Sequence, residues 1–539
     1  MNMKTFKTIA LFIILAMAAI GCQKPYPVVV IPEPTEYQPK RGNFTLDDQV
    51  TLCFENIQDD ATFAKTVREQ YQDFFQHKPN LSEGKPSKGS YMLFSINEKE
   101  EEDLGEEGYR LVVTRKYIQA KANTTKGLFY AFQTIKQLSY PSELGEGKEI
   151  LIPCLKMTDV PRFSYRGAHL DVSRHFFDTA YIKHYLDLMA SYKLNKFHWH
   201  LTDDHGWRIA IDKYPELTRV GAWRPERDSW DTLHPVQPEE PMTYGGFYTK
   251  EQIRDIIDYA AARYIDIIPE IEIPGHCSAI LAAYPQFACD DYPYTVAVGP
   301  YWPPKAIMCA GNDQVLTFYK DVLAEVADLF PYPYIHIGGD EAFNDNWQVC
   351  PKCQARIQEK GLADEFNLQQ WLMNEIEVYL KGIDKKAIVW DDVVSEDMQI
   401  TSTIMGWQGY KAARIAANHG NDVIMSPTTH CYFNYYQADP ETEPLAMTGL
   451  ITLDTAYSFD PMPTGLDETA QHHILGAQCN LWTEFINTPE QADYMLLPRL
   501  CALSECVWTE PDNKDFRTFL RKLDYHKPML KKMGYNCHP

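Results

Sequence analysis

The chain has 539 residues, which is too long for one small core, so at least two domains are expected. Hydrophobic residues make up 45% and charged residues 23%, as in ordinary globular proteins. The net charge is −23 and no long run of lysine or arginine occurs, which argues against a nucleic-acid-binding or anionic-membrane surface. Aromatic residues reach 13%, enough for a large core or for a site in which flat rings stack on sugars.

The first 21 residues have the pattern of an export signal. Lys4 and Lys7 precede an apolar run over 9–20 that is short for a membrane span. The run ends in small residues immediately before Cys22, as in bacterial lipoprotein signals, although Ala19 stands where leucine is more usual. Cys22 is therefore expected to be the lipidated first residue, with an ordinary signal peptide as the alternative. Either interpretation predicts export. On the lipoprotein interpretation the protein reaches the periplasm or the cell surface, with membrane contact only through the lipid anchor.

Residues 22–40 are rich in proline and are expected to form an extended tether. From 41 to 155 the pattern predicts a smaller α+β domain. It lacks a convergent set of polar residues, so a supporting role is favoured. Its expected strands cover 50–54, 91–96, 109–114 and 117–122, and its expected helices cover 61–77 and 125–138.

From 156 to 510 the pattern alternates between apolar strands and amphipathic helices. Eight such repeats, with strands that are apolar on both faces, predict a closed (β/α)8 TIM barrel of the α/β class. A helical tail is expected over 511–539. The expected barrel strands cover 165–171, 196–202, 265–270, 334–338, 387–391, 403–407, 422–426 and 475–481.

The fourth of these strands ends in two glycines followed by Asp340 and Glu341. The glycines predict a close approach to the backbone by something outside the strand. Taken alone, the acidic pair could simply open a helix, whose first turn favours acidic residues. However, barrel enzymes carry their chemistry at the C-terminal ends of the strands. Carboxylates, histidines and tryptophans follow most of the other strands too, which is the inventory that glycosidic bond cleavage needs.

Two alternatives remain open at this point. His198 and His200 lie on one face of a strand and, with His276, His336 and Asp340, could form a zinc hydrolase site. That interpretation leaves the tryptophans unexplained. A glycan-binding lipoprotein on an inactive barrel is the other alternative, because a fold does not guarantee an activity.

Twelve cysteines follow Cys22 with scattered spacing. Cys350-Pro-Lys-Cys353 is the only CxxC motif, and one such pair is weak evidence for zinc. A local disulfide or two free thiols is favoured. No metal, no cofactor and no catalytic cysteine is therefore predicted.

Four segments of the barrel region resemble family 20 glycoside hydrolases, the β-N-acetylhexosaminidases. They are RGAHLDVSRHF at 166–176, HLTDDHGWR at 200–208, PEIEIPGH at 269–276 and GGDE at 338–341. The resemblance runs from the accessory domain to the end of the barrel. It implies a retaining exo-hydrolase that removes terminal β-linked N-acetylglucosamine or N-acetylgalactosamine from glycans. In this family the substrate's own 2-acetamido oxygen attacks C1, giving an oxazolinium-like intermediate.

The resemblance also implies roles for individual residues. Glu341 would be the general acid and then the base, and Asp340 would orient the acetamido group. Glu341 would be supported from behind by Glu272, His276 and Asp203, with Asp204 as the alternative to Asp203. Arg174 and Glu484 would bind sugar hydroxyls, and Tyr432 would bind the acetamido oxygen. Apolar walls around the sugar would be formed by Trp390, Trp407 and Trp482.

One position departs from the family pattern. Asn434 stands two residues after Tyr432, where the family often has aspartate near the sugar's 4- and 6-hydroxyls. An amide keeps hydrogen bonding and removes a charge. This substitution suggests tolerance of a 6-sulfated N-acetylglucosamine, with an unchanged preference as the equally open alternative.

Overall fold

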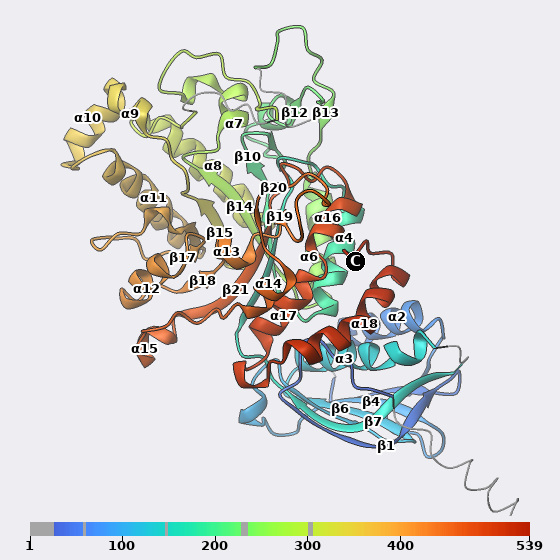
Figure 1. Ribbon diagram of the computed structural model, residues 1–539. Coiled ribbons are helices and arrows are strands. Elements are labelled where there is room, and N and C mark those ends of the chain that lie inside the picture. Colours follow the sequence, from blue (N-terminus) through green and yellow to red (C-terminus); the bar gives the residue numbers. More distant parts are fainter. Residues whose placement is uncertain (1–25, 58–60, 83, 146–148, 228–234, 300–305) are drawn as a thin grey trace, which may run out of the picture. The chain divides into compact units, whose positions relative to one another are not determined.

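The computed structural model describes residues 26–57, 61–82, 84–145, 149–227, 235–299 and 306–539. The predicted export signal and Cys22 lie outside these ranges. The chain forms two compact units (Figure 1). The smaller runs to Pro161 and includes Thr518–Met529; the larger comprises Arg162–Arg517 and Leu530–Pro539. Among the described residues, no helix combines the length and the hydrophobicity that crossing a bilayer requires.

The smaller unit is a seven-stranded mixed sheet in the order β1-β7-β5-β6-β4-β2-β3. Helix α3 (Thr125–Glu143) begins at Thr124, whose side chain accepts from the backbone amides of Lys126 and Gly127, and it packs on the sheet (Figure 1). The other elements are α2 (Ala61–Phe75), η1 (Glu102–Leu104), β1 (Glu36–Leu46), β2 (Thr51–Glu55), β3 (Asn80–Ser82), β4 (Tyr91–Ile96), β5 (Tyr109–Val113), β6 (Tyr117–Ala122) and β7 (Ile150–Asp159).

The predicted tether over 22–40 is wrong for its described part. Residues from Glu36 onward form β1, which pairs antiparallel with β7. Before it, Val29, Val30 and Ile31 are almost completely buried. The Ile31 amide donates to Gln137 Oε1 on α3 at 2.8 Å. Four apolar residues stand between Pro27 and Pro32, and burial of three of them fixes the segment to the core, which the proline composition concealed.

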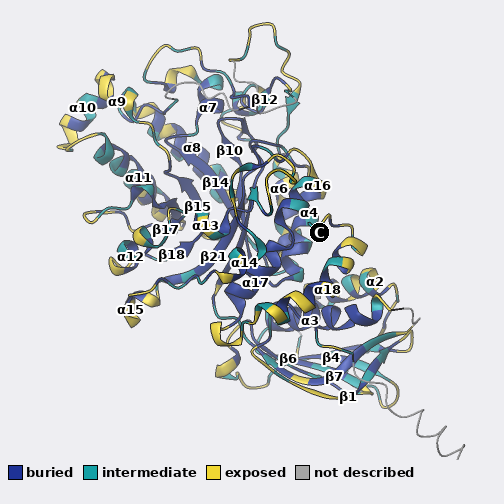
Figure 2. Ribbon diagram, in the orientation of Figure 1, coloured by how far each residue is buried: buried dark blue, intermediate teal, exposed yellow. Residues whose placement is uncertain are grey.

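The predicted barrel is confirmed: eight parallel strands close in the order β14-β15-β16-β17-β18-β21-β8-β9. Almost every strand residue is buried, as expected when helices cover the outside and side chains fill the inside (Figure 2). The strands are β8 (Tyr165–Asp171), β9 (Lys196–His200), β14 (Asp266–Ile273), β15 (Tyr334–Gly338), β16 (Lys386–Trp390), β17 (Thr403–Gly406), β18 (Val423–Met425) and β21 (Ile474–Leu481).

Capping residues start the main barrel helices. Asp178, Thr249, Asn312 and Asp364 each accept a backbone N–H in the first turn, and Thr249 forms a complete capping box with Gln252. The helices of this unit are α4 (Thr179–Ser191), α5 (Glu216–Arg219), α6 (Lys250–Ala261), α7 (Ser278–Ala283), α8 (Asp313–Leu329), α9 (Asp345–Val349), α10 (Pro351–Lys360), α11 (Glu365–Gly382), α12 (Tyr410–Asn418), α13 (Thr428–Cys431), α14 (Leu453–Ser458), α15 (Glu468–Gln471), α16 (Pro489–Leu496) and α17 (Arg499–Trp508).

Two predicted helices differ from the structure. The sequence pattern after the eighth strand predicts one helix over about 489–507, but it is divided into α16 and α17 at Pro498, whose nitrogen cannot donate a helical hydrogen bond. The expected tail is helix α18 (Phe516–Lys532), but residues Thr518–Met529 group with the smaller unit. There His526 Nε2 lies 2.6 Å from the Val29 carbonyl, and Lys522 Nζ donates to Val30 at 2.6 Å.

Short elements follow the barrel strands in the long connections. These connections include the segments that carry the candidate site. The short elements are β10 (Thr202–Asp203), β11 (Gly206–Trp207), β12 (Trp223–Arg224), β13 (Tyr244–Gly245), β19 (Tyr435–Tyr436), β20 (Met447–Leu450), η2 (Pro285–Phe287), η3 (Asp391–Val393) and η4 (Pro511–Asn513).

Candidate active site

Asp340 and Glu341 lie in a turn between β15 and α9, so the acidic pair does not open a helix. The two glycines do permit a close approach to the backbone, and the groups that approach are the protein's own side chains. A Cβ on Gly338 would lie 1.9 Å from Glu272 Oε2, and one on Gly339 would lie 3.2 Å from Met373 Cε. Both glycines have positive φ and face the protein's own side chains, so they form the turn and make room for the protein rather than for a ligand.

The carboxyl of Glu341 is half exposed, unlike its neighbours in the site. Burial of the group raises its pKa, the negative charge of Asp340 adds to this effect, and His276 opposes it. The net direction is upward, so the protonated form persists to higher pH than in an ordinary glutamic acid. A carboxyl of this kind suits proton donation near neutral pH.

Asp340 is nearly buried, and its Oδ1 has no hydrogen-bond partner among the described residues. Its Oδ2 lies 3.6 Å from His276 Nε2. A buried carboxylate oxygen without a donor is costly in a folded protein. The arrangement therefore leaves one acceptor ready for a donor on a ligand.

His276 links the acidic pair to two further carboxylates. Its Nε2 lies 3.6 Å from Glu341 Oε2, while its Nδ1 lies 3.4 Å from Asp203 and 3.2 Å from Asp204. Burial lowers the pKa of His276, but the acidic groups outweigh it and hold the pKa well above its ordinary value. Asp204 is also fixed by the amide and hydroxyl of Ser278. Both aspartates thus contact the imidazolium that faces Glu341.

Arg174 is held by acidic side chains at the end of β8. It donates to Asp171 Oδ2 at 3.1 Å, forms an ion pair with Asp203 Oδ2 at 2.8 Å, and lies 4.0 Å from Glu484 Oε1. Its Nε and the Glu484 Oε2 are buried without a described hydrogen-bond partner. The Arg174 Nε donor and the Glu484 Oε2 acceptor thus remain for sugar hydroxyls.

Three of the predicted aromatic residues lie together. Tyr432 has its ring centroid 6.3 Å from those of both Trp407 and Trp482. The Trp407 indole donates to Asp392 Oδ2 at 2.7 Å, and the same carboxylate accepts from the Glu341 amide at 3.4 Å. The acidic group of Asp392 therefore ties an aromatic wall to the Glu341 turn.

Trp390 lies deeper than predicted. It is 1% exposed, and its indole donates to Glu270 Oε1 at 2.8 Å inside the barrel. Its ring centroid is 5.9 Å from that of Trp482, so it backs the aromatic group from below.

The predicted zinc residues do not converge on one point. Three histidines instead surround the fully buried Glu270: His198 Nε2 at 3.0 Å, His336 Nδ1 at 2.8 Å and His200 through a short contact. The pKa of Glu270 is held well below its ordinary value because these histidines outweigh its burial. We call these four residues the Glu270 cluster. His276 and Asp340 belong to the separate group described above, and the Glu270 cluster has no exposed surface for a substrate.

Glu272 was predicted to support Glu341. Among its described neighbours its carboxyl lies against Gly338 and 4.0 Å from His200 Nδ1, not against Glu341. Burial raises its pKa well above the ordinary value, and the charge of Asp340 adds to the rise. It is therefore a neutral carboxyl beneath the acidic pair.

Asn434 is buried with its Oδ1 unpartnered among the described residues. No role was predicted for Asp392, which follows the fifth barrel strand. Burial raises the pKa of Asp392 to about 6, and the negative charge of Asp340 adds to the rise. The adjacent carboxylates Asp391-Asp392 were the available signal, because a strand end with two acids resembles the 340–341 pair.

Comparisons with known proteins agree with this geometry. Residues 163–511 match the glycosyl hydrolase family 20 catalytic domain, and residues 28–160 match domain 2 of the same family. A "Beta-hexosaminidase" of Porphyromonas gingivalis is 38% identical over 94% of this chain and 64% of its own length. One of Vibrio furnissii is 38% identical over 74% of this chain and 65% of its own length. The chain thus spans slightly less than two thirds of these relatives.

A solved structure is similar over nearly the whole chain. The exo β-N-acetylglucosaminidase of Vibrio harveyi, crystallised with N-acetylglucosamine, superposes with a TM-score of 0.83 at 32% identity. The alignment covers 96% of this chain and 80% of that one. The resemblance stated from the sequence motifs is confirmed.

Proposed function

Because the chain belongs to glycosyl hydrolase family 20, we propose that it is a retaining exo-β-N-acetylhexosaminidase acting by substrate assistance. The observation that carries the proposal is the pairing of a half-exposed, high-pKa carboxyl at Glu341 with the unpartnered Oδ1 of Asp340. One group can hold a proton while the other accepts one hydrogen bond. The proposed substrate is a glycan that ends in a β-linked N-acetylhexosamine.

In the first step, Glu341 donates its proton to the glycosidic oxygen as the C1–O bond breaks. The substrate's acetamido oxygen forms the new bond to C1, and Asp340 accepts from the acetamido N–H and stabilises the positive charge that develops there. In the second step, water attacks C1 and Glu341 takes its proton, while the C1–acetamido bond breaks. Each step inverts C1, so the product keeps the β configuration.

Surrounding residues would position the sugar. Tyr432 would donate to the acetamido oxygen, beside the rings of Trp407 and Trp482. Arg174 and Glu484 would bind hydroxyls through their unpartnered atoms. Trp390 would exclude water from below.

The decisive experiment compares an aryl N-acetyl-β-glucosaminide with the matching aryl β-glucoside. The two substrates share a leaving group and differ only at C2, so a substrate-assisted enzyme should cleave the first and nearly ignore the second. Equal rates would contradict substrate assistance. Sugar binding without turnover of either compound would instead favour a glycan-binding protein on the same barrel.

We also propose that Asn434 permits a 6-sulfated sugar, because its buried side-chain amide carries no negative charge where the family often has a carboxylate. A carboxylate there would repel sulfate. Asn434→Asp should lower the ratio of sulfated to plain turnover, whereas Asn434→Ala, which adds no charge, should lower it less. An Asn434→Asp ratio equal to the parent's would contradict the idea.

We further propose that Cys22 carries a lipid anchor on an exported protein, on the basis of the residues that precede it. Cells fed radiolabelled palmitate should label the parent chain and not Cys22→Ser. The variant should be released from the membrane fraction. Equal labelling of both chains would refute the anchor.

A further inference from the structure

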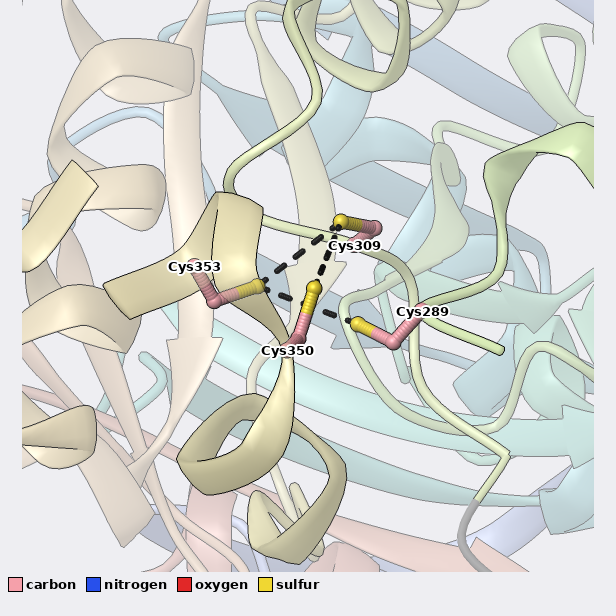
Figure 3. A group of neighbouring side chains, drawn as sticks. All are labelled: Cys289, Cys309, Cys350 and Cys353. Carbon is pink, nitrogen blue, oxygen red and sulfur yellow. Dashed lines mark hydrogen bonds between the residues drawn. The ribbon is translucent and has the colours of Figure 1, made fainter. Parts of the chain in front are cut away.

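Four cysteines from separate parts of the larger unit gather between the loop after β14 and the loop after β15. Their thiols point toward one another (Figure 3), and their sulfur atoms lie within 4.8 Å of one another. Three of the side chains are buried and one is half-buried. We call Cys289, Cys309, Cys350 and Cys353 the cysteine cluster.

The sulfur separations fit a shared metal ion. Sγ of Cys309 lies 3.7 Å from those of both Cys350 and Cys353, and Sγ of Cys289 lies 3.8 Å from that of Cys353. Four sulfurs placed tetrahedrally at the Zn–S distance of about 2.3 Å would be about 3.8 Å apart. A disulfide would require about 2.05 Å. The predicted local disulfide between Cys350 and Cys353 is therefore wrong. Both cysteines are free, as the other predicted alternative has it, and both thiols face partners from another loop.

The backbone around the cluster is shaped for this approach. A Cβ on Gly311 would lie 2.2 Å from the backbone carbon of Lys352, so only glycine lets the two loops meet there. Arg356 Nη2 lies 3.5 Å from the Gly311 carbonyl and also pairs with Asp313, so this side chain on α10 helps to hold the two loops together.

We propose that the cysteine cluster binds one structural Zn²⁺ ion. An all-sulfur tetrahedral set selects zinc or iron among common metals, and four protein ligands leave no open position for catalysis. Zinc has no redox chemistry of its own, which suits a site that only joins two loops. The proposal does not depend on the glycosidase activity.

The position of the ion explains what it would stabilise. Next to Cys309, the Met308 amide donates to the Pro274 carbonyl at 3.1 Å, and the Met308 carbonyl accepts from the Trp347 indole at 2.9 Å. Pro274 lies two residues before His276, and Trp347 lies on α9, which follows the Glu341 turn. The ion would therefore hold together the two loops that present His276 and Glu341.

The test measures metal and protein in the purified full chain. Native mass spectrometry and elemental analysis should find about one zinc per chain, retained through gel filtration. Cys350→Ser and Cys289→Ser should lose most of it. Serine is itself a good N-cap, so the first change preserves the start of α10. The matched control is Cys537→Ser, a half-buried cysteine of the same unit, which should retain the zinc.

Further readouts keep the test decisive if a variant fails to fold. Anomalous scattering at the zinc edge from parent crystals should place one peak among the four sulfurs. Chelation should release zinc, expose four additional thiols to alkylation and lower the melting temperature. Disulfides linking these cysteines, iron in place of zinc, or free thiols without metal would each overturn the proposal, and none of these results would bear on the hydrolase reaction.

Discussion

The barrel contains two acidic groups with similar residues and opposite chemistry. In the Glu270 cluster, one ionised carboxylate accepts from the Trp390 indole and shares a short hydrogen bond with His200, nitrogens of His198 and His336 lie within 3.0 Å of it, and the group is fully buried. In the acidic pair above it, one carboxyl is half exposed with a raised pKa and the other keeps an unpartnered oxygen. Residue type alone does not separate a structural cluster from a reactive one; the satisfaction of hydrogen bonds does.

The largest effect is expected at the reactive group. Glu341→Gln removes the titrating proton and preserves shape, so kcat should fall about 10²–10⁴-fold. The melting temperature should change little, since the side chain is half exposed. Steady-state kinetics on an aryl N-acetyl-β-glucosaminide and thermal unfolding would measure both. Retention of most activity would show that another group donates the proton.

A matched pair of substitutions tests the structural group. Glu270→Gln removes the buried charge that pairs with His200, whose pKa it helps to raise to about 10, and unfolding should become easier by about 3–5 kcal/mol. Glu272→Gln, two residues away on the same strand, replaces a neutral carboxyl with a neutral amide and should cost about 1 kcal/mol or less. Denaturant unfolding measures both. Equal losses would mean that the two carboxyls carry the same charge in the folded protein.

The pH profile connects the two groups through His276. Glu341 must be protonated to act as the acid, so kcat/KM should fall as pH rises through its raised pKa. The positive charge of His276 favours the ionised form of Glu341 and thus lowers that pKa. His276→Gln removes this positive charge, so the alkaline limb of the kcat/KM profile should move to higher pH, whatever the loss in rate. A shift to lower pH would refute the assigned charge.

The smallest effect is expected from Asp392. Its negative charge acts on the pKa of Glu341 in the direction opposite to the positive charge of His276. Its carboxylate raises the pKa of Glu341 by repulsion when ionised, as Glu341 does for Asp392. Asp392→Asn keeps an acceptor for the Trp407 indole. The alkaline limb should therefore move slightly to lower pH. The same profile measured for His276→Gln provides the comparison of opposite sign.

Much of this could be predicted from the chain alone. Apolar strand segments alternating with amphipathic helices predicted the barrel, and the GGDE motif at 338–341 predicted the position of the acidic pair. The roles of the glycines and of Glu272 could not be predicted, because they depend on which side chain occupies the space above Gly338. The short apolar segment at 29–31 was hidden by its prolines.

The sequence by itself determined the barrel, the order of its strands and the residues at their ends, since these follow from local periodicity and chain direction. The tertiary structure decided which polar groups have partners. It placed Glu270 among three histidines, left Asp340 with a free oxygen, and brought Cys289 and Cys309 to a CxxC pair that looked isolated. Hydrogen bonds and metal ligation depend on distances of a few ångströms between residues far apart in the chain, and no local pattern encodes such distances.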